Sequence, residues 1–239
     1  CIGSFLNVCI YRIPREESIV FPASHCTACG YELKVLDLIP VISYIFLRGK
    51  CRSCGEKISI KYPLVEILNG VIYLLMYLRF GLTLNFVAYS IFASLLIVIS
   101  YIDLESKDVY SSTTIFGLVL GVIYILIGLY TKDTTLINNL LGGVIGYLII
   151  YLIVVITNGM GQGDADIAGI CGLFIGIKGI LVALFLAIVL GGIVASIILL
   201  LKLKDKKSEI AFGPYIAIGT IIYIFIGQEL LSFYLSFFI

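Results

Sequence analysis

Long apolar segments, separated by short polar connections, fill the chain from about residue 62 to its end. Most of them approach the roughly 20 helical residues that cross the hydrocarbon core of a bilayer. The segment 167–177 is short for a full crossing and is expected to be tilted or partly re-entrant. The predicted helices cover residues 62–80, 84–102, 112–130, 136–157, 167–177, 179–201 and 212–233.

Two other regions come before these helices. Residues 1–11 are apolar but only about half as long as a span, and we interpret them as the end of a first, truncated transmembrane helix. Residues 12–61 form a polar block, and residues 62–239 form the main membrane domain. The pattern therefore predicts an all-α polytopic membrane protein with about eight transmembrane helices and a small loop domain.

The composition agrees with a membrane protein. Of the 239 residues, 61% are hydrophobic and 13% are charged, whereas about 25% of the residues in a soluble domain are charged. A net charge of +1 provides no basic stripe of the kind that nucleic-acid-binding proteins carry. We therefore expect the lipid bilayer, and no nucleic acid, as a partner.

The basic residues predict how the chain is oriented in the membrane. If the polar block faces the cytosol, only Arg79, Lys132 and Lys178 of the 16 basic residues fall on the outer side. Such an excess of Lys and Arg is typical of the cytosolic loops. Two aspartates, Asp103 and Asp164, then lie at the same cytosolic face, because an even number of crossings separates them.

Two Cys-x-x-Cys pairs in the polar block have a spacing typical of a zinc site. They are separated by 21 residues, and a glycine follows each pair. Four thiolates suit tetrahedral, structural zinc, which would stabilise a block too small and polar to form its own core. Two disulfides are the alternative, which a reducing cytosolic location disfavours, and His25 is interpreted as a surface residue. The predicted ligands are Cys26, Cys29, Cys51 and Cys54.

The two aspartates are candidates for acid–base chemistry at the membrane boundary. Asp103 follows the segment 84–102, and Asp164 ends the glycine-rich run 159–164. A pair of carboxylates that shares one proton can activate water and protonate a leaving group without a metal. Gly161 and Gly163 would let the backbone bend and another segment approach closely.

Structural roles for these aspartates remain open at this point. Asp103 could pair with Lys107, four residues on, and Asp164 could be the N-cap of a helix that begins near residue 167. Asp108 and Asp166 compete for the same catalytic roles.

Six segments, in order along the chain, resemble the motifs of one family, the bacterial type IV prepilin peptidases. These GxGD-type membrane aspartyl proteases cleave leader peptides and methylate the new N-terminus. The resembling segments are residues 3–8 with 11–14, the two Cys-x-x-Cys pairs, and residues 61–66, 102–104, 159–164 and 212–215.

The resemblance implies an activity, a substrate and a location. Asp103 and Asp164 would be the catalytic pair, with Gly161 and Gly163 as part of the motif. The substrate would be a prepilin or pseudopilin, cleaved after its basic leader at the cytosolic face of the bacterial inner (cytoplasmic) membrane. The cysteine loop would bind zinc in the cytosol, and S-adenosylmethionine is the implied methyl donor, with no binding residues identified.

Three positions depart from the family pattern, and two other functions stay open. Tyr110 and Ser111 stand where the family has Pro followed by Asp or Asn, and Asp166 stands where it has Lys. A proton-coupled transporter could use Asp103 or Glu66, because carboxylates inside a membrane also mark ion paths. A non-catalytic factor for pilin assembly is the third hypothesis.

Overall fold

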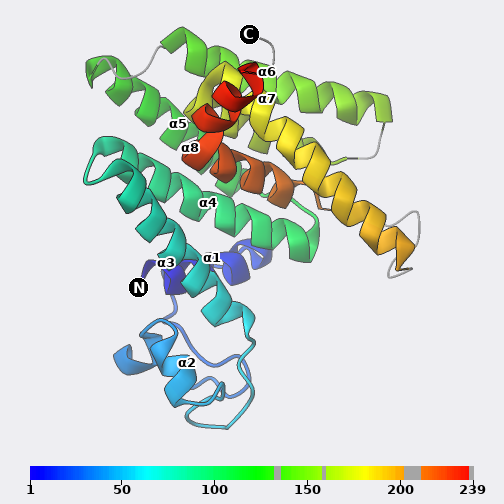
Figure 1. The fold of residues 1–239 in the computed structure, drawn as a ribbon. Coiled ribbons are helices and arrows are strands. Elements are labelled where there is room, and N and C mark those ends of the chain that lie inside the picture. Colours follow the sequence, from blue (N-terminus) through cyan, green and yellow to red (C-terminus); the bar gives the residue numbers. More distant parts are fainter. Residues whose placement is uncertain (132–135, 158–159, 202–210, 237–239) are drawn as a thin grey trace. The chain divides into compact units, whose positions relative to one another are not determined.

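The computed structural model describes residues 1–131, 136–157, 160–201 and 211–236 (Figure 1). Gly159 and Lys132, which the sequence analysis singled out, lie outside these ranges. The described residues form helices and two isolated β-bridges. The chain divides into two units, Cys1–Val98 and Ile99–Ile239, and the boundary falls inside helix α4 (Leu84–Ser106).

In the first unit, helix α1 lies against helix α3 (Figure 1). Leu6 and Ile10 of α1 and Val65 of α3 are buried at this contact. Gly3 allows the close approach, because a Cβ at this position would lie 2.7 Å from the Cα of Glu66. The unit contains α1 (Ile2–Arg12), η1 (Ile13–Arg15), η2 (Val35–Leu38), α2 (Ile42–Phe46), α3 (Lys61–Phe80) and the first part of α4.

Local sequence signals set the ends of α3 and the start of α4. Pro63 lies in the first turn of α3, where its missing N–H costs no helical hydrogen bond. Gly81 ends the helix with a positive φ of 62°, and its N–H donates to the carbonyl of Tyr77 at 2.8 Å. The hydroxyl of Thr83 then accepts the N–H of Phe86 at 3.3 Å and caps α4.

In the second unit, helix α7 packs against three other helices: α5, α6 and α8 (Figure 1). The backbones of α6 and α7 touch at Gly142 and Gly172, where a Cβ on Gly172 would overlap the carbonyl of Gly142. Small residues at such a crossing are typical of packed membrane helices. The helices are α5 (Ser111–Thr131), α6 (Leu136–Thr157), α7 (Gln162–Leu200) and α8 (Gly213–Leu235).

Helix α7 is broken at Gly176, whose φ of 69° and ψ of −174° are not helical. The predicted segments 167–177 and 179–201 therefore correspond to the two halves of one element. Two asparagines of α6 satisfy backbone groups beside the break: Asn139 donates to the carbonyl of Leu173 at 2.8 Å, and Asn138 accepts the N–H of Ile177 at 3.3 Å. Such partners allow a helix to break within apolar surroundings.

Five helices in the described part of the chain are long and apolar enough to cross a membrane. These helices establish a largely helical, polytopic membrane protein, whereas the count of about eight spans stays a prediction. The five candidates are Lys61–Phe80, Leu84–Ser106, Ser111–Tyr130, Leu136–Thr157 and Gln162–Ile198.

Candidate active site and metal site

Helix α4 ends at Ser106, four residues beyond the predicted end at residue 102. Asp103 therefore lies in the last turn of this helix. Only 4% of Asp103 is exposed. Its Oδ2 accepts the N–H of Gly213, the first residue of α8, at 3.0 Å. In the described part of the chain its carboxylate forms no ion pair with Lys107, so the structural alternative for Asp103 does not hold.

Asp164 is the third residue of α7 and is also buried, with 6% exposed. The helix begins at Gln162 rather than near residue 167, so Asp164 is not its N-cap. Its backbone N–H donates to the carbonyl of Gly161 at 3.2 Å. Gly163 is needed for packing, because a Cβ there would collide with the side chain of Val109.

The two aspartates meet at the N-terminus of α8. The carboxylate of Asp164 interacts electrostatically with that of Asp103, and the N–H of Gly213 donates a hydrogen bond to the Asp103 carboxylate. Gly213 cannot carry a side chain here, since a Cβ would lie 2.7 Å from Oδ2 of Asp103 and 2.9 Å from Cδ1 of Ile167. The sequence analysis did not assign Gly213 to the site, although it noted the motif 212–215.

The two competing acids have different surroundings. Asp108 and Asp166 are both exposed, and Asp108 lies close enough to Asp103 to interact with it electrostatically. Burial therefore separates Asp103 and Asp164 from their acidic neighbours. Two buried carboxylates that interact with each other can share a proton and bind a water molecule between them.

The four predicted metal ligands come together in the first unit as a group able to hold a metal ion. The Sγ atoms of Cys26, Cys29, Cys51 and Cys54 all lie within 4.8 Å of one another, and those of Cys26 and Cys54 are 3.9 Å apart. A tetrahedral zinc ion with Zn–S bonds of about 2.3 Å requires sulfurs about 3.8 Å apart. All seven cysteines are described and are free thiols, so the structure does not contain the two disulfides of the alternative.

The two Cys-x-x-Cys loops have the same backbone structure. In each loop the N–H of the first cysteine donates to the carbonyl five residues on, from Cys26 to Tyr31 and from Cys51 to Glu56. The following glycine, Gly30 or Gly55, has a positive φ and donates back to the first cysteine. These positive φ values explain why glycine follows both pairs.

Backbone amides favour the thiolate form of Cys51. The N–H groups of Cys54 and Ser53 lower the pKa of Cys51 to about 7, whereas burial and the neighbouring sulfurs raise the pKa of Cys54 to about 12. A thiolate is the form that binds metals, so the turn prepares Cys51 for a cation.

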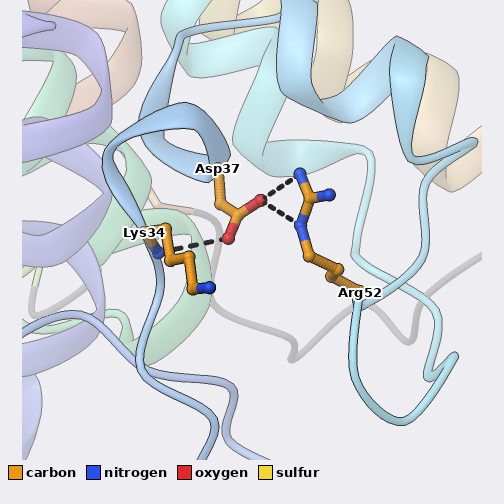
Figure 2. A network of polar contacts seen from close by, with 3 residues as sticks. All are labelled: Lys34, Asp37 and Arg52. Carbon is orange, nitrogen blue, oxygen red and sulfur yellow. Dashed lines mark hydrogen bonds and ion pairs between the residues drawn. The ribbon is translucent and has the colours of Figure 1, made fainter.

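An ion pair joins the second loop to η2 (Figure 2). Nη2 of Arg52 lies 2.7 Å from Oδ1 of Asp37. The backbone N–H of Lys34 donates to Oδ2 of the same carboxylate at 3.1 Å. Burial of Asp37 alone would raise its pKa. The hydrogen bonds from Arg52 and from the Lys34 amide, together with the positive charge of Arg52, outweigh this effect, so the pKa of Asp37 is lowered. The contact fixes Arg52, and with it Cys51, against η2.

Two family models match the chain. Residues 1–80 match the bacterial peptidase A24 N-terminal domain, and residues 90–196 match the type IV leader peptidase family. The first match contains the cysteine group, and the second contains Asp103 and Asp164. No solved structure matches the chain.

Similar proteins span nearly the whole chain. A prepilin leader peptidase/N-methyltransferase of Bacillus subtilis (strain 168) is 32% identical over 236 residues, which is 98% of this chain and 94% of the relative. A relative with the same name from Xanthomonas campestris is also 32% identical and covers 99% of this chain and 91% of its own length. A relative with the same name from Neisseria gonorrhoeae is 32% identical over 91% of this chain and 84% of its own length.

The fold and the two sites thus define a polytopic membrane protein with a buried carboxylate pair and a four-cysteine group. The chain belongs to the type IV leader peptidase family.

Proposed function

We propose that the chain is an aspartic endopeptidase that removes the leader from type IV prepilin-like or pseudopilin substrates and then methylates the new N-terminus. The observation that carries the peptidase function is the buried pair Asp103 and Asp164, whose carboxylates interact electrostatically beside the N-terminus of α8. The names of the relatives support both activities.

The proposed hydrolysis uses the two carboxylates in different protonation states. One takes a proton from a water molecule as this water attacks the scissile carbonyl, and the other donates a proton to the leaving nitrogen. The Gly213 N–H holds the Asp103 carboxylate in one orientation during this exchange. Gly161 and Gly163 form the turn that places Asp164 at the start of α7.

The proposed location is the bacterial inner membrane, with both aspartates and the cysteine loop on the cytosolic side. The excess of Lys and Arg in the loops on that side supports the orientation. The proposed architecture has about eight transmembrane helices in the bilayer. Its parts are a first helical segment (1–11), a zinc-binding loop domain (12–61) and a peptidase domain (62–239).

We further propose that zinc is the metal of the four-cysteine group. The sulfur positions and the lowered pKa of Cys51 fit this ion. Four thiolates complete a tetrahedral coordination shell and leave no position for a catalytic water, so zinc would have a structural role. It would stabilise the loop domain, whose short elements bury few apolar side chains.

The proposed methyl donor is S-adenosylmethionine, a cationic sulfonium cofactor that supplies an electrophilic methyl group when bound. The first unit contains a cavity of about 390 Å³, within the range of about 300–1,000 Å³ for small-molecule sites. Polar and aromatic side chains line this cavity, including Asn7, Tyr44 and Glu66. Its size and lining therefore fit a nucleoside cofactor.

The test of the peptidase function compares three variants on a prepilin substrate in membranes. We expect Asp103→Asn and Asp164→Asn each to abolish cleavage while the protein still inserts, because each variant lacks one of the two proton-transfer groups. Asp166→Asn is the matched control, since Asp166 is exposed two residues from Asp164, and it should cleave normally. Full cleavage by either of the first two variants would contradict the assignment.

A further inference from the structure

The cavity of the first unit belongs to a different part of the molecule from the carboxylate pair. All of its lining residues fall within Cys1–Val98, whereas Asp103 and Asp164 belong to the second unit. Side chains from α1, α2 and α3 line it, together with Cys26 and Cys51 of the metal group. The peptidase chemistry therefore leaves this cavity without a role.

Glu66 of α3 places a carboxylate in the wall of this cavity. Its Oε1 accepts the hydroxyl of Ser4 at 2.5 Å, and its Oε2 accepts the N–H of Val41 at 2.7 Å. Both donors are neutral, and within the described ranges no cation is paired with Glu66. A carboxylate has about four acceptor positions, so positions remain for a cationic ligand.

The backbone at Val41 is strained in a way that serves this contact. Val41 has a φ of 61° and a ψ of −47°, which is an unfavourable conformation for a β-branched residue. Strained residues of this kind cluster at functional sites, where the surrounding structure holds them. Here the conformation directs the Val41 N–H to Oε2 of Glu66, so the carboxylate is held in place from two sides.

Glu17, Asp37, Glu56 and Lys57 also line the cavity, together with two arginines, and both arginines have partners in the protein. The guanidinium of Arg12 donates to the carbonyls of Ser18 and Pro22, both at 2.8 Å. Arg52 is paired with Asp37 (Figure 2). Tyr44 and Tyr62 also line the cavity, and tyrosine rings attract cations, whereas the ring of Tyr11 already holds the guanidinium of Arg15 at 3.8 Å.

We propose that Glu66 is the residue that recognises the positive charge of S-adenosylmethionine in this cavity. The inference rests on the proposed N-methyltransferase function and identifies the site of its methyl donor. In this assignment Ser4 and Val41 position the carboxylate, and the tyrosines contact the cofactor. Glu66 then determines the preference of the cavity for a cationic ligand over a neutral nucleoside.

Equilibrium binding to the purified, zinc-loaded full chain tests this assignment with two probes. S-adenosylmethionine carries the cationic groups, and 5′-methylthioadenosine is a neutral analogue that retains the nucleoside. We expect Glu66→Gln to weaken binding of S-adenosylmethionine about tenfold or more and to change binding of the analogue less than about twofold. Glu16→Gln is the matched control, because Glu16 is an exposed carboxylate of the same unit that does not line the cavity, and it should bind both probes as the wild type does.

Two results would overturn the assignment: unchanged affinity of Glu66→Gln for S-adenosylmethionine, or an equal loss for both probes, which would indicate a structural role. Prepilin cleavage and zinc content report whether the variant is folded. If it is not, carbodiimide modification of Glu66 in the wild type replaces the variant. We expect S-adenosylmethionine to protect Glu66 from modification, and modification that proceeds equally with and without the cofactor would contradict the proposal.

Failure of the proposed function gives a different pattern. A wild-type chain that neither methylates a cleaved pilin nor binds S-adenosylmethionine would remove the methyltransferase function itself. A chain that methylates, with a Glu66→Gln variant that binds the cofactor normally, would remove only the role of Glu66.

Discussion

Gly213 shapes the carboxylate site through its backbone alone. Its N–H donates to Asp103, and the space where a side chain would stand is filled by Asp103 and Ile167. The position of the buried Asp103 carboxylate therefore depends on a residue that has no reactive group.

We predict that Gly213→Ala lowers the rate of prepilin cleavage about 100-fold, because a displacement of about 1 Å at reacting groups can have an effect of this size. The added methyl group would be 2.7 Å from Oδ2 of Asp103 and would push the carboxylate away. Single-turnover cleavage rates measure the effect. Gly70→Ala is the control, since open space lies beside this glycine, and a rate equal to wild type in Gly213→Ala would refute the role of the close contact.

The ion pair between Asp37 and Arg52 predicts a pH-dependent contribution to stability. The pKa of Asp37 is lowered in the folded chain, so its ionised form stabilises the fold above its ordinary pKa of about 3.9. This contribution is lost as the pH falls through the lowered pKa. We expect Asp37→Asn to reduce the Tm at pH 7, and the difference from wild type to shrink below about pH 4. A difference that does not change with pH would contradict this account.

At the scale of elements, the crossing of α6 and α7 depends on glycines. We predict that Gly172→Ala destabilises the membrane unit by about 1–3 kcal/mol, the usual cost of overfilling a packed contact. Thermal unfolding in detergent measures the change. Gly192→Ala in the same helix is the control, because a Cβ there meets no atom within 4 Å. Equal stability of the two variants would show that the close crossing is not needed.

The sequence could predict the long helices because each has an apolar run of nearly a membrane thickness. It placed a boundary near Gly176, where α7 is broken, but it could not show that the two halves continue as one element. The short elements η2 and α2 lie in residues 35–47, an apolar stretch too short to cross a membrane, which the prediction included in the polar block. The strained backbone at Val41 could not be predicted from the sequence either, because valine rarely adopts a positive φ.

The candidate site was partly predictable for a similar reason. Helix crossings and loop charges placed Asp103 and Asp164 on one face of the membrane before their geometry was known. The hydrogen bond from Gly213 joins residues 110 positions apart, and no local pattern encodes such a contact. The cysteine spacing was sufficient to predict the four-cysteine group, because both loops use the same local turn.

At the scale of the whole molecule, the metal should decide whether the first unit is stable. We predict one zinc ion per chain, and loss of this ion with destabilisation of the unit in Cys26→Ser or Cys54→Ser. Metal analysis and limited proteolysis of the purified chain measure the two effects. Cys1→Ser is the control, because Cys1 is not part of the group. A zinc-free wild type with all thiols intact would contradict the metal assignment.

The central claim is that Asp103 and Asp164 together cleave a leader peptide from a prepilin. The most direct measurement incubates membranes that contain the chain with a prepilin and determines the N-terminal residue of the product by sequencing and mass spectrometry. The account predicts a product that begins immediately after the leader with the wild type, and an intact prepilin with the double variant Asp103→Asn/Asp164→Asn. The same product from the double variant would contradict it.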